Sequence, residues 1–71
     1  MGYCKDLERL AKVSFEKFML YIDEHRNLFI NTNEDENDNT EIEVTDIDND
    51  GNEELIGRFY FDENGDYIKG E

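Results

Sequence analysis

The chain has 71 residues and a formal net charge of −13, because 20 acidic side chains outnumber seven basic ones. A chain of this length is expected to form a single domain, 1–71, with a small core and no room for a deep cleft between two lobes. The single Cys4 excludes an internal disulfide, and no apolar run approaches the roughly 18 residues that span a bilayer. We therefore expect a soluble, cytoplasmic binding protein that is not an enzyme.

An amphipathic helix is predicted at about residues 3–26. Apolar residues recur there at three- and four-residue spacings, and charged residues mostly occupy the other side. Asp6 lies in the expected first turn and Arg26 in the last, which suits the helix dipole. The apolar stripe expected to face the core consists of Tyr3, Leu7, Leu10, Ala11, Phe15, Phe18 and Ile22.

Strands are predicted after the helix, where the apolar period changes to two. Residues 28–30 form a short candidate strand, and the acidic, polar run at 31–40 should be a solvated loop. Residues 41–70 alternate apolar and polar positions around turn signals, which predicts β-hairpins. The predicted fold class is therefore α+β, with one N-terminal amphipathic helix packed on a three- or four-stranded antiparallel sheet.

The alternation also predicts which side chains each face of the sheet presents. The residues expected to face the helix are Ile42, Val44, Leu55, Phe59 and Phe61. The residues expected on the opposite face are Ile56, Tyr60 and Ile68. That second face would be covered by a partner, covered by a second copy in a homodimer, or left exposed, and the sequence leaves these alternatives open.

Residues 46–54 carry oxygen-bearing side chains at the spacing of a calcium loop. Calcium binds six to eight oxygens, and carboxylates at relative positions one, three and five before a glycine allow a loop to wrap around it. The segment resembles the DxDxDG loops of bacterial strand-loop-strand calcium modules. As the alternative to a protein without cofactors, that resemblance implies calcium bound by Asp46, Asp48, Asp50, Asn52 and Glu54.

The same segment departs from the helix-loop-helix version of such loops. Position twelve is Gly57 where a bidentate Glu is usual, and Glu53 stands where an apolar residue is usual. The missing ligand predicts weak binding, with a dissociation constant of roughly 0.1 to 1 mM. A tight turn at residues 49–52 with exposed flanking acids is the equal alternative.

The acidic residues are concentrated in the second half of the chain. Residues 1–30 hold five acids and five bases, whereas residues 31–71 hold fifteen acids against two bases and carry the whole net charge. On a strand, alternate carboxylates lie about 6.6 Å apart, which is close to two phosphate steps of DNA. The acids expected on a partner-binding surface are Glu34, Asp35, Glu36, Asp38, Glu41, Glu43, Asp46, Asp48, Asp50, Glu53 and Glu54.

In size, charge and layout the chain resembles the small acidic phage proteins that mimic DNA, including anti-CRISPR and anti-restriction inhibitors. The resemblance implies an inhibitor in the host cell cytoplasm that binds a basic nucleic-acid-binding protein, such as a nuclease complex, by imitating phosphates. We expect no direct binding to nucleic acid and none to membranes. The alternatives are the weak calcium module and an acidic immunity or interaction protein.

Catalytic residues are not predicted. His25 and Cys4 are the only residues of their types, and nothing in the sequence places an orienting group beside either. The acidic loops are too polar to raise the pKa of a carboxyl for acid catalysis. A structural role is expected for both residues.

Overall fold

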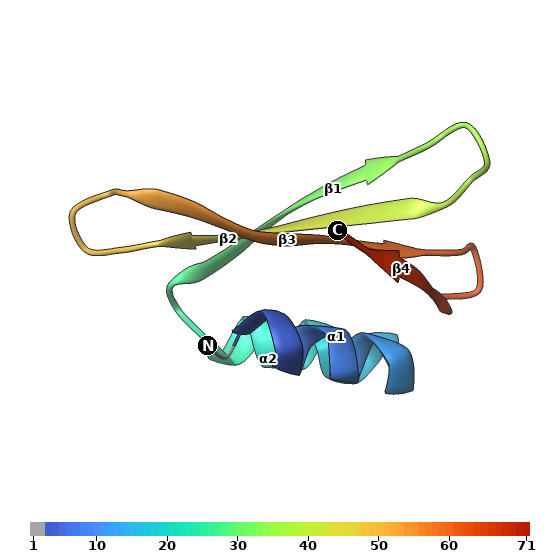
Figure 1. Cartoon of the computed structure of the whole chain (residues 1–71), viewed down its shortest axis with the longest axis horizontal. Helices are drawn as coiled ribbons and strands as arrows, with labels where there is room; N and C mark the ends of the chain where they lie inside the picture. Colours follow the sequence, from blue (N-terminus) through green and yellow to red (C-terminus); the bar gives the residue numbers. More distant parts are fainter. Residues whose placement is uncertain (1–2) are drawn as a thin grey trace.

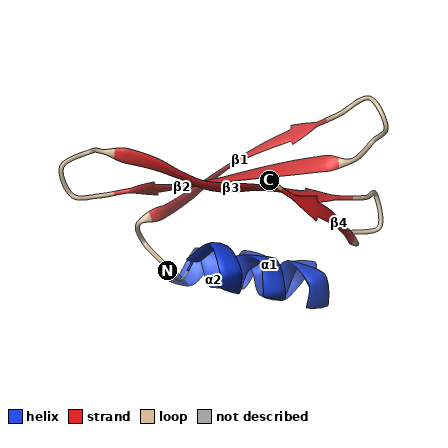
Figure 2. Cartoon of the chain, viewed as in Figure 1, coloured by secondary structure: helices blue, strands red, loops and turns tan. Residues whose placement is uncertain are grey.

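The computed structural model describes residues 3–71, and it places two helices on one face of a four-stranded antiparallel sheet (Figures 1 and 2). The strands lie side by side in chain order, so each neighbouring pair is a hairpin. The α+β class and the N-terminal position of the helical part are confirmed. The helices and strands are α1 Tyr3–Val13, α2 Phe15–Glu24, β1 Leu28–Glu34, β2 Thr40–Ile47, β3 Glu53–Phe61 and β4 Tyr67–Gly70.

The prediction of one helix over residues 3–26 is wrong, because the helix is interrupted at Ser14. Ser14 has an extended backbone, with φ −164° and ψ 126°, and its hydroxyl accepts a hydrogen bond of 3.4 Å from the Lys17 amide. Such a cap satisfies an amide that has no partner at a helix start, so Ser14 begins α2. The chain then turns back, and the two short helices lie side by side (Figure 1). Within residues 3–71, neither helix is long and apolar enough to cross a membrane.

The core lies between the helices and the sheet. Phe18 of α2 is fully buried, and its ring centroid lies 5.2 Å from that of Phe59 and 5.1 Å from that of Phe61. Leu10 and Phe15 from the predicted apolar stripe are partly buried against the same cluster, which confirms the predicted face of the helical segment. The buried residues are Leu7, Ala11, Phe18, Ile22, Leu28, Ile42, Val44, Phe59 and Phe61.

A β-bulge reverses the predicted faces of two residues in β3. Val44 pairs with Gly57 and Thr45 pairs with Leu55, so β3 has one extra residue, Ile56. An extra residue shifts the alternation of the strand by one position. Ile56 therefore packs against the core and Leu55 is 46% exposed, the reverse of the prediction. The other four residues predicted to face the helix are buried as expected.

Half of the predicted acidic loop at residues 31–40 is strand. β1 and β2 extend into it from both sides and leave only residues 35–39 as a turn. Asn33 has a low strand propensity, but its side chain donates a hydrogen bond of 3.2 Å to Glu41 across the hairpin. Cross-strand pairing thus overrides the local preference for a loop.

Candidate acidic interaction surface

Charge is divided between the two layers of the fold. The helices belong to residues 1–30, where five acids and five bases cancel, whereas the sheet from residue 31 onward carries all of the −13. The helices cover one face of this sheet and leave the other face open (Figure 2). The acidic surface is therefore made by the open face and by the two ends of the sheet.

Most of the exposed acids lie at the two ends of the sheet. The β1–β2 and β3–β4 turns lie at one end, here called the two-turn end, and the β2–β3 turn lies at the other, the one-turn end (Figure 1). A shallow pocket lined by both Glu34 and Glu63 shows that the two turns of the two-turn end are neighbours. The exposed acids of the two-turn end are Glu34, Asp35, Glu36, Asp38, Glu63 and Asp66. Those of the one-turn end are Asp48, Asp50, Glu53 and Glu54.

Sequence reasoning missed Asp62, Glu63 and Asp66 as part of the acidic surface. They belong to the β3–β4 turn, where the sequence predicts only a turn within the β-hairpins of residues 41–70. In an antiparallel meander, every second turn falls at the same end of the sheet. A predicted hairpin of β1 with β2 would therefore have placed the β3–β4 turn at the same end of the sheet as residues 34–38.

The β2–β3 turn is organised by the carboxylate of Asp48. One oxygen of Asp48 accepts hydrogen bonds from the backbone amides of Asp50 and Asn52, each at 2.9 Å. The hydrogen bonds from Asn52, first from its backbone and then from its side chain, lower the pKa of the Asp48 carboxyl below its ordinary value. Gly51 completes the turn with φ 86°, a left-handed conformation that glycine adopts without strain.

The other two turns repeat this arrangement. Asp35 accepts hydrogen bonds from the third and fifth residues of the turn 35–39, and Asp62 does the same in the turn 62–66. The shared pattern is an Asp followed two and four residues later by Asn or Asp. One acid in each turn is thus needed to form the turn, and one oxygen of its carboxylate already accepts hydrogen bonds from backbone amides of that turn.

The contacts of residues 46–54 are those of a turn. Asp48 already accepts amides of its own loop, and Asp46 accepts a hydrogen bond of 3.0 Å from Asn27, beside the start of α1. Gly57, at the twelfth position, is a buried strand residue whose Cβ position would lie 3.2 Å from a backbone oxygen, so a ligand there would enter the core. Within residues 3–71, no three His, Cys, Asp or Glu side chains lie close enough together to hold a metal ion.

We expect calcium at about 1 mM to raise the unfolding midpoint no more than magnesium at the same concentration. Both ions screen a protein of charge −13, but a calcium site with a dissociation constant of 0.1 mM would add about 1.4 kcal/mol of stability. Thermal melts with each ion and with EDTA make the comparison. A rise seen only with calcium, and abolished by Asp48→Asn, would establish the calcium module instead.

Glu41 and Glu43 lie on the open face of the sheet, as their two-residue spacing predicts. Arg58 lies between them, with its Nε 3.2 Å from a Glu43 oxygen and 3.8 Å from a Glu41 oxygen. Asn31 and Asn33 donate further hydrogen bonds to these two carboxylates from β1. The two acids are therefore partly compensated within the fold, and the uncompensated charge lies mainly at the ends.

Tyr60 continues this polar network on the open face. Its hydroxyl donates a hydrogen bond of 2.8 Å to Glu41, and the Lys69 ammonium lies 4.9 Å from the centre of its ring. The hydrogen bond to Glu41 favours the neutral phenol and raises the pKa of Tyr60 to about 12.

We expect the ionisation of Tyr60 to be the late step in the alkaline titration, and Glu41→Gln to move it back towards the ordinary value of about 10. Because the pKa of Tyr60 is raised on folding, its contribution to stability is complete below pH 10 and is lost as the pH rises through about 12. Tyrosinate absorbance of the wild type, Glu41→Gln and Tyr60→Phe measures this. Superimposable curves for the wild type and Glu41→Gln would show that the hydrogen bond does not form.

His25 lies outside the acidic surface, whereas Cys4 lines a shallow pocket together with Asp46 and Glu54. The His25 Nδ1 is 2.6 Å from the Tyr21 carbonyl oxygen, and its ring stacks on that of Tyr21 with centroids 4.4 Å apart. Cys4 is exposed near the start of α1. The contacts of His25 are those of a side chain that packs at the end of α2.

Comparisons with known proteins assign no family to the chain. No protein-family model matches it, and neither a curated protein nor a solved structure is detectably similar to it.

Proposed function

We propose that this chain is a non-catalytic inhibitor whose acidic sheet binds a basic, nucleic-acid-binding protein at the surface where that protein binds phosphates. The observation that carries the proposal is the separation of charge: the helical layer is neutral, and the sheet bears the whole net charge of −13. Self-repulsion of this size destabilises a compact domain. An acidic surface kept at that cost is typical of a protein that must attract a cationic partner.

Size and charge density support mimicry of a nucleic acid. The Cα trace extends 37 × 23 × 18 Å, and one turn of duplex DNA is about 34 to 36 Å long. Over that length a duplex carries about 20 phosphate charges, so the chain presents more than half as much net charge. A channel lined with Lys and Arg would attract such a surface over a distance of about one Debye length, roughly 8 to 10 Å.

The open face also offers an apolar contact between the acidic ends. Phe29 and Leu55 are 50% and 46% exposed, and both pair with Thr45, so they lie in one row across the sheet. Exposed apolar side chains surrounded by charge are the usual anchors of a protein interface. The acids would then set the rate and specificity of association, and the apolar row would slow dissociation.

The test is whether DNA and the chain compete for one surface of the same partner. The immobilised chain is incubated with bacterial lysate at about 50 mM salt and eluted with a short DNA duplex. Each eluted protein is then purified and assayed for binding of a labelled duplex by anisotropy, with and without the chain. We expect the chain to displace the duplex, and less effectively as salt rises to about 200 mM.

Two results would contradict this function. One is recovery of partners that bind no nucleic acid, which would favour an acidic immunity or interaction protein. The other is a ternary complex, in which the captured protein binds the duplex and the chain together. A bovine serum albumin matrix, which is also acidic, serves as the control for charge alone.

A further inference from the structure

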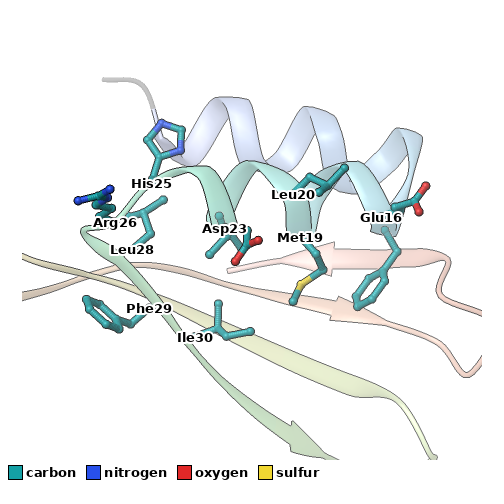
Figure 3. A pocket seen from close by; sticks show the side chains of 11 residues that line it. Glu16, Met19, Leu20, Asp23, His25, Arg26, Leu28, Phe29 and Ile30 are labelled. Atoms are coloured by element: carbon teal, nitrogen blue, oxygen red, sulfur yellow. The ribbon is translucent and has the colours of Figure 1, made fainter.

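A groove runs between α2 and β1, along the edge of the sheet that β1 forms. Its volume is about 770 Å³, and it is lined by α2, the linker that follows it and the first part of β1. Figure 3 shows Met19 reaching from α2 towards the sheet, with Phe29 and Ile30 on the strand below it. Leu20 on the helix is 53% exposed, so apolar surface remains accessible here.

The strand beneath this groove is an open edge of the sheet. β1 is the first strand in the order β1-β2-β3-β4, and it has seven residues against four in the other edge strand, β4. The carbonyl of Asn27 accepts the Ile47 amide, and the amide of Asp35 donates to the Asn39 carbonyl. Because bonded positions alternate in an antiparallel pair, the odd-numbered residues from 27 to 35 bond to β2. The backbone groups of the even-numbered residues therefore point to the open edge.

This edge lacks most of the features that keep edge strands from pairing. Natural edges are protected by prolines, bulges, lysines or short length. The register of β1 with β2 is regular along seven residues, the chain has no proline, and the only charged side chain of β1 is Glu34. The amide and carbonyl of Thr32, an exposed residue in the middle of this stretch, are thus available to another strand.

We propose that the edge of β1 and the adjoining groove bind an extended segment with alternating apolar and basic side chains, which adds a fifth strand to the sheet. Its backbone would pair with Ile30 and Thr32, and its apolar side chains would enter the groove beside Met19. The basic character of the segment rests on the proposed function, whereas the strand pairing does not.

Charge decides between such a segment and a second copy of the chain. The walls of the groove include Glu16 and Asp23 against Arg26, and Glu34 ends the strand, so the site has an excess of acids. A second copy would bring another −13 against it, whereas Lys or Arg side chains would be attracted. The occupant is therefore a segment of a basic partner.

The probe is a capped peptide as long as β1 in which lysine and valine alternate. A block peptide of the same composition, with all lysines before all valines, keeps the charge and loses the alternation. Fluorescence anisotropy gives the affinities, and amide chemical shifts locate the binding. We expect the alternating peptide to bind at least about tenfold tighter, which is the worth of one or two backbone hydrogen bonds, and to shift the amides of Ile30 and Thr32.

Two pairs of variants test the edge and the groove separately. Thr32→Pro removes the outward amide, whereas Thr32→Ala keeps it, and both leave the β1–β2 ladder intact. Met19→Gln makes the groove polar, and Val13→Gln is its control at an exposed apolar site outside the groove. We expect the first member of each pair, and not the second, to lower affinity for the alternating peptide about tenfold.

Equal binding of the two peptides, or equal binding by Thr32→Pro and Thr32→Ala, would overturn strand addition. Sedimentation that shows a dimer of the free chain, dissociated by Thr32→Pro, would overturn it in favour of a second copy. Neither result affects the competition assay with DNA, which needs only the acidic ends. Conversely, failure of the competition assay would not change the expected difference in affinity between the two peptides, because strand pairing does not depend on the proposed function.

Discussion

Replacement of Phe18 by alanine should remove a large part of the free energy of unfolding. The side chain is fully buried, and the rings of Phe15, Phe59 and Phe61 pack around it at centroid distances of 6.4, 5.2 and 5.1 Å. Removal of a buried phenyl ring from a core costs about 3 to 5 kcal/mol. The total stability of a 71-residue domain is only about 4 to 10 kcal/mol, so the substitution removes much or all of it.

Leu20→Ala is the matched control for this prediction. Leu20 lies on the same helix but is 53% exposed, so its loss should change the free energy of unfolding by about 0.5 kcal/mol or less. Urea denaturation followed by circular dichroism compares the three proteins. Equal midpoints for Phe18→Ala and the wild type would mean that α2 packs on the sheet through another face.

The helical part of the fold could be predicted except for its break. The three- and four-residue spacing of apolar residues continues through Ser14, so the periodicity alone favours one helix over residues 3–26. A serine is a good cap but is also tolerated inside helices, and local preference does not choose between the two. The choice is made by packing, because the return of α2 beside α1 allows Leu7 and Phe18 to be buried in one core.

The buried face of the sheet could be predicted, but the bulge in β3 and the polar end of β1 could not. Ile42, Val44, Phe59 and Phe61 are buried as their alternation predicts. The bulge at Ile56 has no local sequence signal, since it depends on the register between β2 and β3. The polar end of β1 has none either, because its asparagines are stabilised by acids eight or more residues away.

The acidic surface could be predicted in composition but not in layout. The sequence indicates which residues are acidic, and Glu41 and Glu43 share a face as expected, but the neutralising position of Arg58 depends on strand pairing. The spacing of Asp46 and Asp48 fits both a calcium loop and a turn. Their hydrogen-bond partners, Asn27 and Asn52, are identified only by the fold.

Neutralising acids at either end of the sheet should slow association with the basic partner recovered by competition with DNA. The pair Glu36→Gln and Glu63→Gln changes the two-turn end, and the pair Asp50→Asn and Glu53→Gln changes the one-turn end. All four side chains are exposed, and none accepts the hydrogen bonds that form the turns. The fold should therefore be retained, and its stability should be equal or higher because self-repulsion falls.

The helical layer supplies the control for total charge. Glu8→Gln with Glu24→Gln also changes the net charge from −13 to −11, but on the neutral helical layer and at neither acidic end of the sheet. Steered association changes rates by about 10 to 1000-fold in total, so we expect each end pair to lower the rate constant about threefold and both together about tenfold. The helical pair should have little effect. Stopped-flow or surface-binding kinetics at about 50 mM salt measures these rates. Equal slowing by all three pairs would mean that the partner responds to net charge alone, and that the acidic ends of the sheet form no specific binding surface.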